Sequence, residues 1–126
     1  MDISNAELEV MQVLWQQHPC TAADVIGCLQ QQKDWHEKTI KTLLNRLVSK
    51  GALSYQKQGR AYLYSPRIAQ QDYQQQASGS FVHKLFAGRV APLVASFARK
   101  HEVSAADLAE LKKLVADLEQ EQQEDN

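Results

Sequence analysis

The chain has 126 residues, of which 44% are hydrophobic, and its formal net charge is −1. This length suits one domain, or a small domain with an appendage, and its modest core would gain from an association helix or a partner chain. No apolar run approaches the roughly 18 residues of a membrane span, and the N-terminus has neither a basic start nor an apolar signal core, so we expect a soluble cytoplasmic protein.

The first two predicted helices are marked by their caps. Ser4 followed three residues later by Glu7 is a capping box that begins the first helix. Thr21 with Asp24 repeats this spacing and begins a short second helix. The polar stretch 30–34 that follows is predicted to be a turn.

A third helix is predicted from about His36 to Lys50, and Gly51 suits the left-handed position that ends it. Its apolar face is expected to be buried, and it consists of Ile40, Leu43, Leu44 and Leu47. The opposite, polar face is formed by Lys38, Thr42, Asn45 and Ser49, with Lys41 and Arg46 at the edges. The helical wheel places Thr39 closer than Thr42 to the buried boundary.

After Gly51 the spacing of apolar residues changes from helical to alternating. Residues 53–57 and 61–65 alternate in polarity, and the intervening residues 58–60 include a glycine, so a β-hairpin is predicted. Three short helices followed by a hairpin are the order of elements in a winged helix. We assign this domain to residues 1–67.

Residues 68–126 are predicted to form three more helices. They begin near Gln70, around Pro92 and after Ser104, and the last of them is expected to fray over the acidic residues 119–126. The last helix carries an apolar stripe at helical spacing, made of Leu108, Leu111, Leu114, Val115 and Leu118. The expected fold is therefore predominantly α with a small β-hairpin (α+β), a winged helix-turn-helix plus a C-terminal helical region.

Charge is distributed unevenly along the chain. From Lys33 to Arg67 there are eight basic and two acidic residues, a net of +6, whereas residues 68–126 hold six basic and nine acidic ones, a net of −3. Such asymmetry is expected when one segment meets a polyanion. Charge alone fits a solvated surface equally well.

The polar face of the third helix has the chemistry of DNA recognition. Asparagine suits adenine, arginine suits guanine, and a threonine methyl can meet the thymine methyl. The helix residues predicted from this chemistry to contact bases or phosphates are Lys38, Lys41, Thr42, Asn45, Arg46, Ser49 and Lys50, with the lysines assigned to phosphates. At the hairpin, Lys57 and Arg60 are predicted to contact the backbone or the minor groove, and an ordinary polar turn is the alternative.

The string KDWHEKTIKTLLNRLVSKG at residues 33–51 resembles the KDW-x-x-KTI-[KR]-TL-x-x-RL-x-x-KG signature of the penicillinase and methicillin-resistance repressors (the BlaI/MecI/CopY family). The opening ISNAELEVM at residues 3–11 and the segment 81–97 are also similar to that family. The resemblance implies a winged helix that binds a palindromic operator in double-stranded DNA, a C-terminal homodimer and no cofactor. It assigns operator-reading positions to Lys38, Thr39, Thr42 and Arg46.

The sequence of the C-terminal region also favours a homodimer. The apolar stripe of the last helix has little other chain to cover it, although an intramolecular core is the alternative. The side chains predicted to form the dimer are Phe81, Leu85, Leu93, Phe97, Leu108, Leu111, Leu114, Val115 and Leu118.

The chain departs from two regulatory patterns of this family. Relatives that control lactamase genes are cut before a Phe, commonly after Asn, by a membrane sensor protease pathway; the matching bond here is Ser96–Phe97. Copper-responsive relatives carry C-terminal Cys-x-Cys motifs, and this tail has no cysteine, which excludes copper release through them. Cys20 and Cys28 are interpreted as reduced, partly buried thiols, and four scattered histidines give no metal-site spacing.

Two other classes of function are alternatives to a DNA-binding repressor. A winged helix can serve as a protein–protein interaction module without DNA-binding activity. The basic residues Lys57 and Arg60 argue against that, because a protein-binding wing would not need them. An enzyme is the weakest hypothesis, since the sequence has no Gly-rich phosphate loop, zinc-site spacing or recognisable nucleophile–base arrangement.

Overall fold

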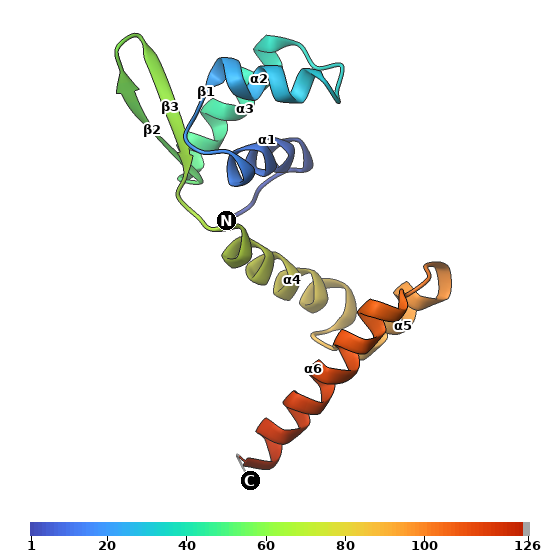
Figure 1. The fold of residues 1–126 in the computed structure, drawn as a ribbon. Coiled ribbons are helices and arrows are strands. Elements are labelled where there is room, and N and C mark those ends of the chain that lie inside the picture. Colours follow the sequence, from blue (N-terminus) through green and yellow to red (C-terminus); the bar gives the residue numbers. More distant parts are fainter. Residues whose placement is uncertain (125–126) are drawn as a thin grey trace. The chain divides into compact units, whose positions relative to one another are not determined.

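Six helices and three short strands are arranged along residues 1–124, the part of the chain that the computed structural model describes (Figure 1). They are α1 (Asn5–Gln16), β1 (Cys20–Thr21), α2 (Ala22–Gln30), α3 (Glu37–Lys50), β2 (Leu53–Gln58), β3 (Ala61–Pro66), α4 (Gln70–Phe86), α5 (Val90–Lys100) and α6 (Ala105–Glu124). The predicted fold class, mostly helical with a small antiparallel sheet, is confirmed.

The caps predicted for α1 and α2 form as expected. In α1 the Ser4 amide donates to Glu7 Oε1 at 3.0 Å, and the Glu7 amide donates to Ser4 Oγ at 3.1 Å. Thr21 and Asp24 exchange the same pair of hydrogen bonds at the start of α2. These reciprocal bonds satisfy backbone N–H groups that the first turn of a helix leaves without partners.

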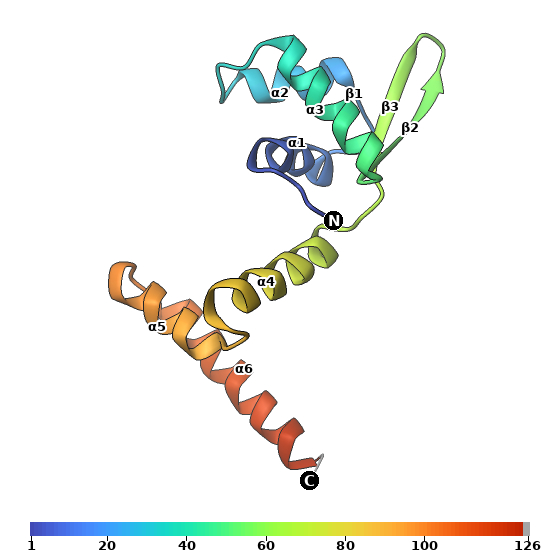
Figure 2. The same cartoon turned by 180° about the vertical axis from the view of Figure 1, so that it is seen from behind.

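The hairpin joins a third strand that the sequence analysis missed. The sheet order is β1-β3-β2, with antiparallel pairing throughout, and the hairpin turns at Gly59, whose φ of 65° favours glycine. Strand β1 has only two residues, so it shows no alternation of its own. It forms because Cys20 and Thr21 meet Tyr64 and Leu63 of β3, a long-range contact (Figure 2).

The core of the N-terminal unit fixes the orientation of α3. The apolar face predicted for this helix is buried, with Ile40, Leu43, Leu44 and Leu47 each at most 5% exposed. They pack with buried side chains from α1, α2 and the start of β2. Full burial of one such side chain stabilises the fold by about 1.5–3 kcal/mol, so the helix is held with its polar face outward.

An ion pair links the beginning of α1 to the end of α3. Lys50 Nζ lies 2.6 Å from Glu7 Oε1 and donates to the Asp2 carbonyl at 2.8 Å. Glu7 is 2% exposed, whereas the Lys50 side chain is 38% exposed. Burial alone would raise the pKa of Glu7, but the hydrogen bonds from Lys50 and Ser4 outweigh it, so the pKa lies below its ordinary value.

Replacing Lys50→Met is expected to lower the free energy of unfolding by about 2–3 kcal/mol at pH 7. Losing one partner of a fully buried ion pair costs about 3–5 kcal/mol, and the partial exposure of Lys50 reduces that cost. Because the pKa of Glu7 is lowered, the pair's contribution is complete above about pH 4.5 and is lost as the pH falls through that lowered pKa. The deficit of the variant should therefore shrink in acid, which urea unfolding at pH 3 and pH 7 would measure.

Lys41→Met provides the matched control. Lys41 also forms an ion pair, with Glu37 at 2.8 Å, but both side chains are about half exposed. An exposed pair of this kind contributes little to stability, because water screens the two charges and both side chains lose freedom in pairing. Equal losses of stability in the two variants at pH 7 would contradict the special role of the buried pair.

The chain divides into two units later than the sequence predicted. The units are Met1–Ala77 and Ser78–Asn126, whereas the predicted boundary lies between residues 67 and 68. The start of α4 belongs to the first unit because Tyr73 packs on Trp15, with ring centroids 5.8 Å apart. Trp15 Nε1 also donates to the Ile68 carbonyl at 2.9 Å.

The second unit has helices but no buried side chains among its described residues. The three predicted C-terminal helices are present, and the Ser104 hydroxyl caps α6 by accepting from the Asp107 amide. The expectation that α6 would fray from residue 119 is wrong, because the helix continues to Glu124; residues 125–126 lie outside the described part. No helix described in residues 1–124 is long and apolar enough to cross a membrane.

Candidate DNA interface

The outward face of α3 presents a continuous set of polar and basic side chains. Those predicted to face DNA are all exposed: Lys38, Thr39, Lys41, Thr42, Asn45, Arg46 and Ser49. The structure therefore brings these predicted residues together on one surface. Thr39, which the helical wheel placed near the buried boundary, is exposed as well.

Two local interactions organise this face. Thr42 Oγ1 donates to the Lys38 carbonyl at 2.9 Å, which leaves the hydroxyl oxygen as an acceptor toward solvent. The Lys41 ammonium hydrogen-bonds Glu37 Oε1 and, with its charge, lowers the pKa of that carboxyl group. Because this pair is exposed, a phosphate could replace the carboxylate at little cost.

Lys50 is placed differently from the other predicted DNA contacts. Its ammonium group points toward α1, where it binds Glu7 and the Asp2 carbonyl. This arrangement neutralises the Glu7 carboxylate and occupies two donors of the lysine. The structure thus gives Lys50 a role in holding α3 on α1, and a phosphate contact was predicted because the sequence does not show that partner.

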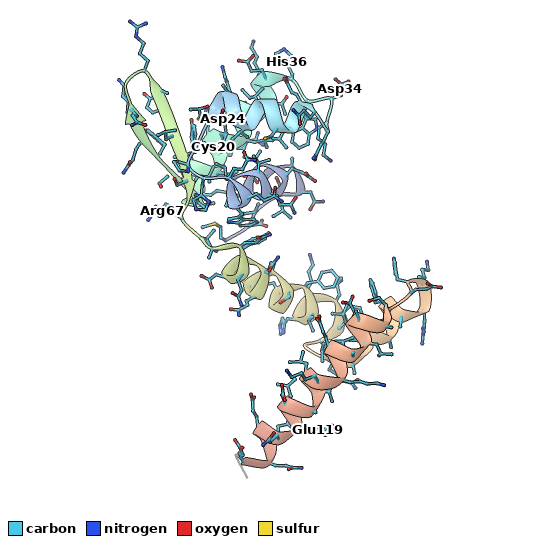
Figure 3. The ribbon with its side chains drawn as sticks, viewed as in Figure 1. Cys20, Asp24, Asp34, His36, Arg67 and Glu119 are labelled. Carbon is cyan, nitrogen blue, oxygen red and sulfur yellow. The ribbon has the colours of Figure 1, made fainter. Side chains whose placement is uncertain are left out.

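The hairpin lies beside α3, and Lys57 and Arg60 are both exposed near its tip. Figure 3 labels His36, at the start of α3, and Arg67, at the base of the hairpin. The His36 Nδ1 atom accepts from the Lys38 amide at 3.0 Å and caps α3.

Between α3 and the hairpin lies a groove that the sequence analysis did not identify. Its volume is about 380 Å³, and its walls are Asn45, Val48, Ser49, Tyr55, Tyr62 and Tyr64. Burial and the neighbouring hydroxyl groups of Tyr55 and Tyr62 raise the pKa of Tyr64, so its hydroxyl stays protonated at neutral pH. The alternation of tyrosines along the two strands was the sequence signal that could have revealed this groove.

The side chains predicted to form a dimer are largely exposed in the single chain. Exposed fractions are 48% for Phe81, 58% for Leu85, 51% for Phe97 and 38–53% for the α6 stripe, while Leu93 is partly buried. Leu93, Phe97, Leu111 and Leu114 line an open groove of about 680 Å³ between α5 and α6. A unit without a core of its own therefore exposes a large apolar surface.

The bond between Ser96 and Phe97 lies inside α5, and both residues are exposed. The Phe97 ring stacks on His101, with centroids 4.5 Å apart. A protease would need to unwind this part of the helix to reach the bond.

Metal-binding chemistry does not gather anywhere in residues 1–124. No group of three or more His, Cys, Asp or Glu side chains in that range is arranged to hold a metal ion. Cys20 is buried and Cys28 partly buried, and both are free thiols. The polar face of α3 and its flanking hairpin are thus the main candidate site.

A helix held by its apolar face, with basic and hydrogen-bonding side chains outward and a basic hairpin alongside, defines a winged-helix DNA-binding protein. Residues 3–117 match the family model described as "Penicillinase repressor". A penicillinase repressor of Bacillus licheniformis is 38% identical over 109 residues, which cover 86% of this chain and 85% of that protein. The methicillin resistance regulatory protein MecI of Staphylococcus aureus (strain N315) is 33% identical, covering 90% and 93%.

The chain belongs to the penicillinase repressor family and is a DNA-binding transcriptional repressor, not an enzyme. Among solved structures, the monomeric form of Bacillus licheniformis BlaI in complex with the blaP half-operator is 45% identical, with a TM-score of 0.52. The match covers 58% of this chain and 89% of the BlaI chain. The resemblance stated from residues 33–51 is confirmed.

Proposed function

We propose that the protein is a cytoplasmic homodimer that binds a palindromic operator and represses transcription. Each α3 enters the major groove of one half-site, and each hairpin contacts the backbone or minor groove beside it. The observation that carries this proposal is the exposed polar face of α3, fixed outward by its buried apolar face. A similar BlaI was solved as a monomer in complex with a half-operator, which supports one N-terminal DNA-binding unit per half-site.

Within this interface, residues have different tasks. Thr42, Asn45 and Arg46 read base edges, because their side chains match the donors and acceptors of the major groove. Thr39 and Ser49, on the same exposed face of α3, also contact base edges. Lys38, Lys41, Lys57 and Arg60 bind phosphates and position the protein. Lys50 is left out of this set because Glu7 already binds its ammonium group.

The C-terminal unit forms the dimer and so brings a second N-terminal DNA-binding unit to the operator. In the single chain α4, α5 and α6 have no buried residues, so a second copy of the unit would give their apolar side chains the cover that they lack. Release from DNA by cleavage at Ser96–Phe97 stays a prediction. It would require a protease that accepts serine before the bond and opens α5 locally.

Arg46→Ala and Thr42→Ala are expected to reduce discrimination between the operator and its single-base variants. Each lost base contact should cost about 1–3 kcal/mol, and only at the base pair that it reads. Titration of fluorescent duplexes carrying each substitution would measure the effect. Lys41→Ala is the control, because loss of a phosphate contact should weaken all sequences alike.

The pattern of losses decides the assignment. If Arg46→Ala weakened every duplex by the same factor, Arg46 would be a backbone contact. If neither variant changed binding to any duplex, the polar face of α3 would not be the reading surface.

A further inference from the structure

The tyrosine groove between α3 and the hairpin is a built feature of the N-terminal unit. The antiparallel register sets Tyr55 opposite Tyr64 and Lys57 opposite Tyr62. Because side chains alternate along a strand and opposite residues share a face, these four side chains lie on the same face of the hairpin. That face closes the groove against Asn45, Val48 and Ser49 of α3.

The rings of this groove hold one another in place. Tyr55 and Tyr62 meet edge to face, with centroids 5.0 Å apart and planes at 88°, and Tyr55 lies 6.0 Å from Tyr64. Tyr64 is partly buried and supports the other two, which remain 51% and 45% exposed. Such fixed rings give up little conformational entropy when a partner covers them.

The groove continues the DNA-facing surface of α3. Asn45 and Ser49 belong both to the groove wall and to the exposed face of the helix. Its lining contains no carboxylate, and every polar side chain in it can donate a hydrogen bond. Lys57, on the same hairpin face, adds a positive charge. A polyanion therefore matches this surface better than a basic or apolar peptide, and its continuity with the exposed polar face of α3 favours the backbone of bound DNA.

We propose that the tyrosine groove binds the sugar–phosphate backbone of one operator strand where that strand borders the major groove. The hydroxyl groups of Tyr55 and Tyr62 donate hydrogen bonds to phosphate oxygens, and their rings pack against deoxyribose. The backbone is the partner because α3 itself occupies the base edges. This inference rests on the proposed function and adds to it a neutral set of backbone contacts beside the charged ones.

Neutral donors have a signature that lysines lack. A lysine that neutralises a phosphate releases counterions and so contributes to the salt dependence of binding, with about one unit of slope per contact. A tyrosine hydroxyl adds affinity without neutralising the phosphate. Contacts from the groove should therefore weaken binding when removed, yet leave both sequence discrimination and the salt slope unchanged.

The test uses the full-length protein and a fluorescent duplex that it selects from a random-sequence pool. Tyr55→Phe and Tyr62→Phe each remove one hydroxyl and keep the ring. Each is expected to weaken binding about three- to tenfold, by the same factor on the selected duplex and on its single-base variants. Tyr73→Phe is the matched control, because Tyr73 packs on Trp15 outside the groove. This variant should bind DNA like wild type.

A second measurement changes the DNA, and its wild-type arm needs no variant of the protein. Duplexes in which single phosphates are replaced by neutral methylphosphonates would be titrated with wild type and with Tyr62→Phe. At the phosphate that Tyr62 contacts, the two losses should not add, because both changes remove the same hydrogen bond. Wild type alone should already show weakened binding at one or two phosphates that flank the major-groove contacts.

The outcomes separate this inference from the repressor function. If wild type selected no duplex, the proposed operator binding would fail, and the groove inference would fail with it. If wild type bound and Arg46→Ala lost discrimination while both Phe variants bound like wild type, only the groove inference would be overturned. A Phe variant that changed discrimination would also overturn it, because the tyrosine would then contact a base.

Discussion

Raising the salt concentration from about 50 to about 200 mM is expected to weaken operator binding by about 10³- to 10⁵-fold. Each protomer exposes Lys38, Lys41, Lys57 and Arg60 on α3 and the hairpin, so a dimer offers enough cations for the six to ten phosphate contacts that give a loss of this size. Each contact releases condensed counterions, which makes the logarithm of affinity fall linearly with the logarithm of salt. Fluorescence titration at several salt concentrations measures the slope.

Two variants with opposite expectations sharpen this measurement. Lys57→Ala should make the slope of log affinity against log salt concentration shallower by about two units per dimer, one for each protomer. Lys50→Met removes the same charge but should leave the slope unchanged, because Glu7 already binds that ammonium group. A salt response that is flat in wild type would contradict the phosphate assignments, and a shallower slope in Lys50→Met would return Lys50 to the interface.

Leu111→Asp is expected to convert the protein into monomers and to weaken operator binding by about 10²- to 10⁴-fold. That factor is the gain from linking two N-terminal DNA-binding units, since the second unit then binds at a high effective concentration. Leu111 lies at the centre of the α6 stripe and lines the groove between α5 and α6, so a carboxylate there would be desolvated in a dimer. Sedimentation equilibrium and titration with whole and half operators measure both effects.

Ala116→Asp is the matched control, because it adds the same charge to α6. By the helical period, position 116 faces away from the apolar stripe. This variant should remain dimeric and bind like wild type. Survival of the dimer in Leu111→Asp would contradict an interface on α6. Loss of the dimer in both variants would mean that charge on the helix, rather than its apolar stripe, decides assembly.

Much of the N-terminal unit could be predicted because its signals are local. The capping boxes at Ser4 and Thr21 formed with the expected hydrogen bonds. The α3 wheel separated buried from exposed side chains correctly, and Gly51 ends the helix with a φ of 83°. Each of these features depends on residues within one or two turns of one another, so spacing alone specifies it.

Features that depend on distant partners could not be predicted. Lys50 looked like any lysine at the end of a basic helix, yet its position 2.6 Å from Glu7 requires α1 to cross near the end of α3. The groove walls come from α3, β2 and β3. The start of α4 belongs to the first compact unit through the packing of Tyr73 on Trp15.

The sequence by itself determined the order of the elements, the buried face of α3 and the family, because periodicity, caps and the 33–51 signature are properties of neighbouring residues. Only the tertiary structure decided which cations of that basic block are free to face DNA. It also aligned three tyrosines of the hairpin beside the polar face of α3. The physical reason is that charge and hydrogen-bonding capacity belong to a residue, whereas their availability depends on the long-range contacts around it.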